Sequence, residues 1–120
     1  NASTKWNLAL DQNHGPYVGG CTNCRGLLTI NTDTNQVNYN EDFYSTASMS
    51  KFIQNKATRI GVTVKNPNLH ATAVSNPDKS LSLIVANDAD TESNYSVWWQ
   101  GRVLSSNIAA KTVNIITWNK

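Results

Sequence analysis

The sequence predicts a mainly β fold of the α+β class: a small antiparallel sheet or half-sandwich with one helix and an N-terminal loop closed by a disulfide. Three observations predict it. Apolar and polar residues alternate with a period of two after residue 57, and one helix candidate lies near residues 40–54. Two cysteines lie in a glycine-rich segment before residue 27. A length of 120 residues predicts a single domain, residues 1–120.

The first part of that domain, residues 1–56, is expected to hold three short strands and a long loop. The loop, residues 12–26, contains Pro16 and several glycines, so it needs special backbone conformations. A polar turn separates the second and third strands, which predicts a hairpin. The three strands are expected at residues 6–11, 27–30 and 36–39.

The helix of this first part is expected to begin after Asn40 and to run to about Gln54. Asn40 is a favourable N-cap residue, and Glu41 and Asp42 lie in the first turn, where carboxylates interact well with the helix dipole. The apolar side chains of this segment are spread around the helix axis instead of forming one stripe. We therefore expect it to be covered on more than one side.

Residues 57–120 are expected to form the strands of a sandwich. The almost wholly apolar segment 81–86 predicts a central strand covered on both faces. Turn-forming residues separate the predicted strands at intervals typical of an antiparallel sheet. The five strands are expected at residues 58–65, 69–75, 81–86, 95–100 and 112–118.

Composition excludes some classes of function. Only 15% of the residues are charged and the net charge is +2, with the basic residues scattered singly, so a nucleic-acid partner is not expected. No apolar run approaches the ~20 residues of a membrane span. The chain starts at Asn1 without Met, and Asn1 and Asn94 open glycosylation sequons. These features predict a processed, secreted, extracellular protein.

The cysteines and histidines are expected to have structural roles and not to bind a metal ion. Cys21 and Cys24 are expected to form a disulfide, because a zinc site needs two more ligands and only His14 and His70 are present. We expect both histidines to be hydrogen-bonded surface groups, and we expect no metal and no cofactor.

The eight acidic residues do not form an obvious catalytic pair. Glu41 and Asp42 fit a helix start, and the acids between Asp88 and Glu92 fit a solvated loop. Neither setting is an apolar pocket that would raise a carboxyl pKa. The chain alone is therefore not expected to be an enzyme.

Aromatic residues are the remaining candidates for a binding site. A flat ring with a polar edge suits a sugar, so Trp6, Tyr17 and Trp98 are candidate carbohydrate-binding residues. Neighbours on a strand face opposite ways, which predicts that one of Trp98 and Trp99 is in the core. For Trp99 and Trp118 the core interpretation is favoured.

Several of these segments resemble a known family. Residues 6–11, Gly15-Pro16 and 19–26, followed by Phe43-Tyr44, residues 50–53 and 59–62, resemble the C-terminal end of glycoside hydrolase family 30. The cysteine-containing loop is most similar to the fungal endo-β-1,6-glucanase branch, and the family also includes lysosomal glucosylceramidase.

The resemblance implies an incomplete active site. In that family the opening stretch is the last strand of a (β/α)₈ barrel, the helix is the last barrel helix, and the later strands form most of a β-sandwich. The catalytic glutamates belong to earlier strands, and Trp6 matches a position that lines the sugar site. A barrel would also explain the all-round apolar helix.

Three hypotheses follow. The first is a secreted non-catalytic protein that binds carbohydrate or a cell-surface glycan, with a defence or cytotoxic role, and that covers its apolar surface as a homo-oligomer. The second is a C-terminal fragment of an endo-β-1,6-glucanase whose catalytic residues lie on a missing barrel chain. The third is a purely structural interaction module.

Overall fold

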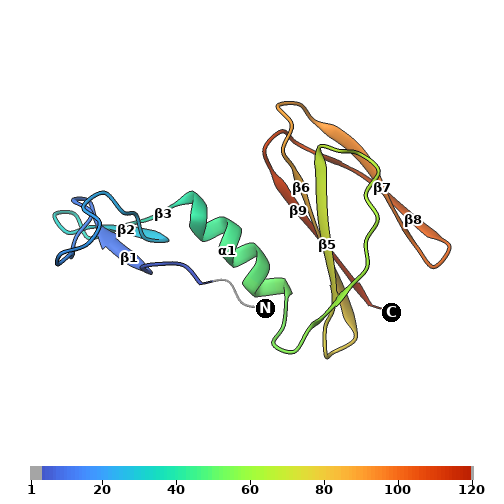
Figure 1. Ribbon diagram of the computed structural model, residues 1–120, viewed down its shortest axis with the longest axis horizontal. Coiled ribbons are helices and arrows are strands. Elements are labelled where there is room, and N and C mark those ends of the chain that lie inside the picture. Colours follow the sequence, from blue (N-terminus) through green and yellow to red (C-terminus); the bar gives the residue numbers. More distant parts are fainter. Residues whose placement is uncertain (1–3, 120) are drawn as a thin grey trace. The chain divides into compact units, whose positions relative to one another are not determined.

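The computed structural model describes residues 4–119 and confirms a mainly β protein with one helix (Figure 1). The chain divides into two compact units, Asn1–Ser48 and Met49–Lys120, called here the N-terminal unit and the C-terminal unit. A single domain over the whole chain stays a prediction, and Asn1 lies outside the described residues.

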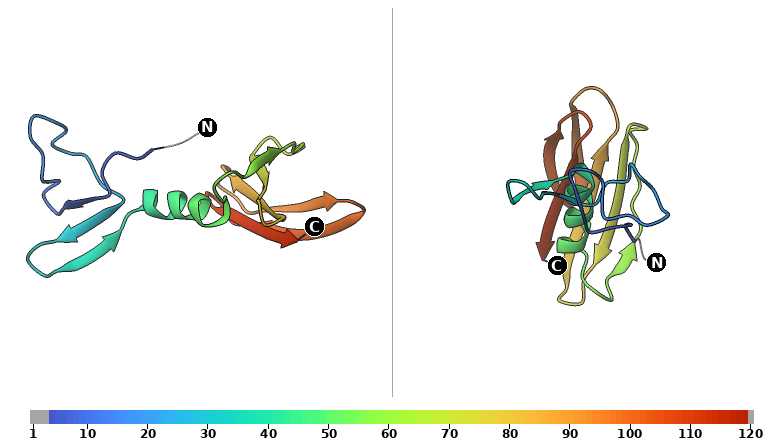
Figure 2. Two further views of the ribbon diagram at one scale, coloured as in Figure 1. Left: turned by 90° about the horizontal axis from the view of Figure 1, so that it is seen from below. Right: turned by 90° about the vertical axis from the view of Figure 1, so that its left-hand side faces the viewer.

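A three-stranded sheet forms the N-terminal unit, with order β1-β2-β3. The strands β2 (Leu28–Asn31) and β3 (Gln36–Tyr39) form the expected antiparallel hairpin, and the Asn31 side chain accepts the backbone N–H groups of its turn. The strand β1 (Ala9–Asp11) pairs with β2 in parallel, a pairing on which the sequence analysis made no prediction. Parallel partners need a long connection, and the long loop between β1 and β2 supplies it (Figure 2).

The helix α1 (Glu41–Phe52) begins where the sequence predicts and crosses the boundary between the units. The carbonyl of Asn40 accepts the N–H of Phe43. The Asn40 amide, however, donates to the Gly26 carbonyl and to Thr29 Oγ1, so it ties the helix start to the sheet instead of capping a helical N–H. Although apolar on most sides, α1 buries none of its side chains.

The C-terminal unit contains a four-stranded antiparallel sheet with order β4-β5-β6-β9. Its strands are β4 (Thr58–Ile60), β5 (Leu69–Ser75), β6 (Ser80–Asn87) and β9 (Val113–Asn119). The apolar strand β6 lies between β5 and β9 and is almost fully buried, as its sequence predicts.

A separate antiparallel hairpin, β7 (Ser93–Trp99) and β8 (Arg102–Ile108), packs on one face of that sheet (Figures 1 and 2). Its inward residues Tyr95 and Val97 contact the core. The buried members of that core are Leu69, Ala73, Leu83, Val85 and Ile108. Gln100 and Gly101, both with positive φ, form the tight turn between the two strands.

Two strand boundaries differ most from the sequence predictions, and one strand was missed. The strand β1 starts at Ala9, so Trp6 lies outside it, and β4 ends at Ile60 instead of continuing to residue 65. The strand β8 was not predicted. Its residues 102–107 are exposed or half-buried and its polar and apolar residues do not alternate, so the pattern carries no strand signal.

A buried asparagine joins the last turn of α1 to the sheet. Asn76 is 6% exposed, and its amide nitrogen donates to the Phe52 carbonyl at 3.1 Å and to the hydroxyls of Ser80 and Ser82. Ser82 donates to the same carbonyl at 2.8 Å. The side-chain oxygen of Asn76, Oδ1, accepts the backbone N–H of Gln54 at 3.0 Å. The buried side chains of Asn76 and Ser82 are therefore both hydrogen-bonded within the protein.

We predict that Asn76→Ala destabilises the C-terminal unit by about 2 kcal/mol, because it leaves the Gln54 N–H without its acceptor and removes one donor from the Phe52 carbonyl. Urea unfolding followed by tryptophan fluorescence measures the loss. Asn68→Ala is the matched control, since only backbone atoms of Asn68 are bonded. Equal stability of both variants would contradict the role assigned to the Asn76 side chain.

A second prediction concerns acid. Hydrogen bonds from the Ser80 hydroxyl and N–H, and then from Gln54, hold the pKa of Asp78 below its usual 3.8. Asp78 therefore stabilises the fold above the unfolded-state pKa, and this contribution disappears as pH falls through the folded-state pKa. Asp78→Asn is expected to reduce the loss of stability below about pH 4. Urea midpoints measured over that range test this, and parallel curves for both proteins would refute it.

Candidate functional site

A loop closed by the predicted disulfide lies between β1 and β2. Cys21 and Cys24 are bonded, with Cα atoms 5.5 Å apart. His14 Nδ1 lies 3.0 Å from the Cys24 carbonyl oxygen, so His14 is the hydrogen-bonded group that the sequence predicts. Asp11 accepts the backbone N–H groups of Asn13 and Gly15 at 2.8 and 2.7 Å. These bonds order the loop on the end of β1.

Gly26 lets this loop return close to β1. A Cβ at Gly26 would lie 3.0 Å from Ala9 Cα and 3.0 Å from the Leu28 carbonyl oxygen, both backbone atoms. Its own carbonyl accepts the Asn40 amide at 2.8 Å. The close approach of the Ala9 backbone to Gly26 therefore favours a glycine at this position.

Two of the predicted sugar-binding residues lie in the N-terminal unit. Trp6, which precedes β1, is 78% exposed, and Tyr17, in the disulfide loop, is 50% exposed. No aromatic contact joins the two rings among residues 4–119. Each is available to a ligand, and their joint role in one site stays a prediction.

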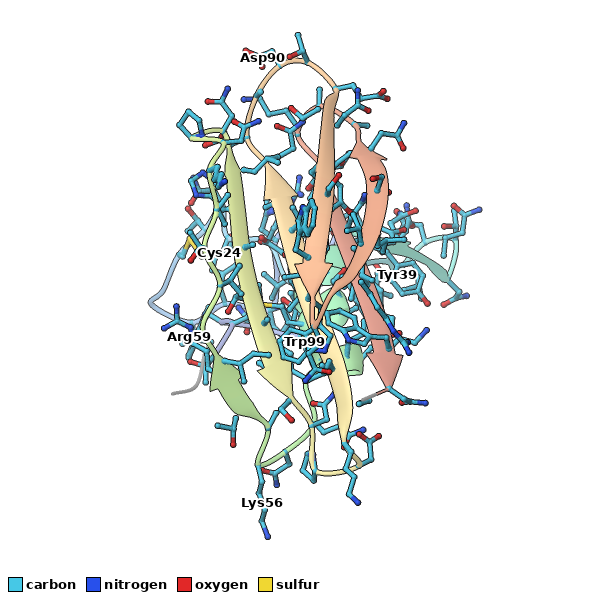
Figure 3. The ribbon with its side chains drawn as sticks, turned by 90° about the vertical axis from the view of Figure 1, so that its right-hand side faces the viewer. Cys24, Tyr39, Lys56, Arg59, Asp90 and Trp99 are labelled. Carbon is cyan, nitrogen blue, oxygen red and sulfur yellow. A yellow bond between two sulfur atoms is a disulfide. The ribbon has the colours of Figure 1, made fainter. Side chains whose placement is uncertain are left out.

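The third predicted residue, Trp98, lies on the C-terminal unit and is 76% exposed. Its neighbour Trp99 faces the opposite way and forms an edge-to-face pair with Trp118, the ring centroids 6.1 Å apart. Trp118 packs against the core cluster, which confirms the core interpretation for that residue. Trp99 is half-buried and contacts the Trp118 ring, but it is not part of that cluster. Figure 3 looks onto the outer side of the hairpin, with Trp99 labelled at the end of β7.

The outer face of the hairpin carries residues that the sequence analysis did not single out. Opposite one another across β7 and β8 lie Asn94 and Asn107, Ser96 and Ser105, and Trp98 and Val103. A hollow of about 550 Å³ is lined by the first two of these pairs together with Tyr95 and Ser106. Alternation along β7 could have placed Ser96 on the same face as Trp98. Ser105 and Asn107 could not be placed there from the sequence, because the strand β8 was not predicted.

The carboxylates serve structural roles. Glu41 pairs with Arg25, Asp42 with Lys5, and Asp90 with Lys111. The pKa of Glu41 is lowered, first by the backbone at the start of α1 and then by Arg25. A glycosidase acid needs a raised pKa, so this shift and that of Asp78 run opposite to the requirement.

The remaining predicted groups are also accounted for. His70 Nε2 lies 2.8 Å from Asp88 at the surface. Among residues 4–119, no cluster of three or more His, Cys, Asp or Glu side chains could hold a metal ion. No helix in that range is long and apolar enough to cross a bilayer.

Comparison with known proteins gives consistent matches. Residues 56–115 match the model of the glycosyl hydrolase family 30 beta sandwich domain. The endo-1,6-beta-D-glucanase BGN16.3 of Trichoderma harzianum is 30% identical over 89 residues, which is 68% of this chain but 18% of that protein. The chain therefore spans less than a fifth of this relative.

Two solved structures share the fold. The endo-beta1,6-glucanase BT3312 superimposes with a TM-score of 0.87 at 27% identity, over 96% of this chain and 26% of that one. SrfJ from Salmonella typhimurium gives a TM-score of 0.91 at 18% identity, again over 96% and 26% of the two chains. The latter match supports the fold alone.

We predict that Gly26→Ala disrupts the pairing of β1 with β2, because the added methyl group would lie 3.0 Å from backbone atoms of Ala9 and Leu28, which would have to shift. Hydrogen exchange should show faster exchange of the Leu28 N–H, which donates to the Leu8 carbonyl. Gly20→Ala is the control, since a Cβ there meets nothing within 4 Å. Unchanged exchange in Gly26→Ala would contradict the close-approach argument.

Proposed function

The chain belongs to the glycosyl hydrolase family 30 β-sandwich domain family, and we propose that it is the non-catalytic C-terminal part of a secreted endo-β-1,6-glucanase. On this proposal the hydrolytic carboxylates lie on a barrel that precedes these residues. The named activities of two relatives support the substrate class. Their greater length supports a missing catalytic part, and the Cys21–Cys24 disulfide is consistent with an extracellular protein.

The observation that carries the proposal is the exposed apolar surface of the N-terminal unit. Leu10 is the one buried hydrophobic residue described between residues 4 and 48, whereas Leu8, Tyr39 and Tyr44 are exposed. A small sheet and a helix with so little buried surface do not offset the entropy lost on ordering them. A barrel in the same protein would cover this surface, and β1 and α1 would then be its last strand and helix.

A self-standing glycan-binding protein is the second candidate, favoured by the exposure of Trp6 and Tyr17. It would bind a carbohydrate or cell-surface glycan in a defence or cytotoxic role, and self-association would cover the N-terminal unit. A purely structural interaction module shares that surface but needs no ligand. Both of these alternatives predict a small native protein, whereas the first proposal predicts a much longer one.

The experiment is to determine the reading frame and intact mass of the native product and to assay it on linear β-1,6-glucan. We expect a product much larger than the 13.2 kDa of this chain, active as a whole, with the isolated 120 residues inactive. In the whole protein, Trp6→Ala should weaken turnover about tenfold or more if its ring contacts sugar. A native product of 13.2 kDa, or enzyme-like turnover by the isolated chain, would overturn the proposal.

A further inference from the structure

We propose that the outer face of the β7–β8 hairpin is a second carbohydrate-binding surface, in which Trp98 stacks on a sugar ring of a neutral β-glucan chain. The inference rests on the proposed function for the identity of the polymer. It concerns a site on the C-terminal unit, whereas Trp6 and Tyr17 belong to the N-terminal unit.

The strand register builds this surface from three successive cross-strand pairs. Trp98 lies opposite Val103 near the turn, and two polar pairs follow at steps of about 6.8 Å along the strands. The polar pairs are Ser96 with Ser105 and Asn94 with Asn107. An aromatic ring is thus continued by a row of hydroxyl and amide groups, as a chain of pyranose rings requires.

Trp98 is not held by the fold. Its side chain is 76% exposed, and the neighbouring Trp99 is the residue that packs against Trp118. A ligand that covers this ring would remove its apolar surface from water, and an indole presents a flat apolar face to the C–H face of a sugar. The exposed Val103 directly opposite widens the apolar platform.

The polar pairs retain hydrogen-bonding capacity. The Ser96 and Ser105 hydroxyls bond to each other at 2.9 Å, which leaves lone pairs free. Within residues 4–119, the side-chain amides of Asn94 and Asn107 make no hydrogen bond. These two asparagines and the two serines line the hollow of about 550 Å³ beside the platform.

The charge of the face selects the ligand class. None of the six outward residues is ionisable. An anionic polysaccharide or a phosphate would require cationic donors, and a protein interface centred on one Trp would ordinarily be surrounded by more apolar area. Uncharged hydroxyl and amide groups beside a single ring favour a neutral glycan over both.

Asn94 is also the acceptor of a glycosylation sequon, so an attached glycan would lie on this same face. The test therefore uses the full 120-residue chain from an oxidising bacterial host, which adds no N-glycan. Retardation in native gels containing linear β-1,6-glucan measures the dissociation constant. We expect Trp98→Ala to raise it about tenfold and Trp98→Phe to raise it less.

Matched controls separate this surface from the other exposed rings and from misfolding. Tyr44→Ala should bind as the unchanged chain does, and a carboxymethylated glucan should not be bound. Trp98 is exposed, so its variants should keep the urea midpoint. In the unchanged chain, bound glucan should shield Trp98 fluorescence from iodide, and Trp98→Ala should lose that shielded fraction.

Two results would overturn the inference: no retardation of the unchanged chain, or equal retardation of Trp98→Ala. A third overturning result could come from sedimentation without glucan. If the unchanged chain self-associates and Trp98→Ala does not, the face is a protein interface and not a glycan-binding surface. The size of the native product tests the proposed function separately. Binding through Trp98 by a protein whose native product is only 120 residues long would reject the glucanase assignment and retain the surface.

Discussion

One partly buried carbonyl, that of Phe52, joins the end of α1 to the sheet of the C-terminal unit. The last carbonyls of a helix have no partner within the helix, and burying one unpaired is costly. Asn76 and Ser82 both donate to it, at 3.1 and 2.8 Å. Asn76 comes from the turn after β5 and Ser82 from β6, so the same bonds that satisfy the helix end also join it to the central strands. The apolar strand β6 can tolerate buried Ser82 because its hydroxyl has this partner.

Asn87 has the corresponding role at the other end of β6. Its amide donates to the carbonyls of Thr91, Ile108 and Ala109, and its carbonyl accepts the N–H of Ala89. One 3%-exposed side chain thereby connects the loop before β7 to the end of β8. The hairpin is fixed to the sheet by this polar junction and by the apolar contacts of Tyr95 and Val97. The two faces of the hairpin are consequently distinct, one packed and one open to ligand.

The sequence predicts those elements whose contacts are with residues nearby in the chain, or whose residues are almost all buried. The strand β6, the β2–β3 hairpin and the first turn of α1 are such elements, because composition and turn chemistry alone specify them. The parallel pairing of β1 with β2 depends on a contact across a long loop, and β8 depends on pairing with β7 despite its exposed, irregular sequence. The Asn40 amide bonds to Gly26 for the same reason: tertiary partners compete with its local capping role.

The candidate site shows the same division between local and tertiary information. Alternation states that Trp98 and Trp99 face opposite ways, but it cannot say which faces inward. That choice follows from Trp118 on β9, a strand about twenty residues away that receives the Trp99 ring at 6.1 Å. Once Trp99 is held there, strand geometry directs Trp98, Ser96 and Asn94 outward together. The open face is therefore a consequence of core packing. If this face binds a ligand, its residues are positioned by the Trp99–Trp118 contact on the inner side of the β7–β8 hairpin.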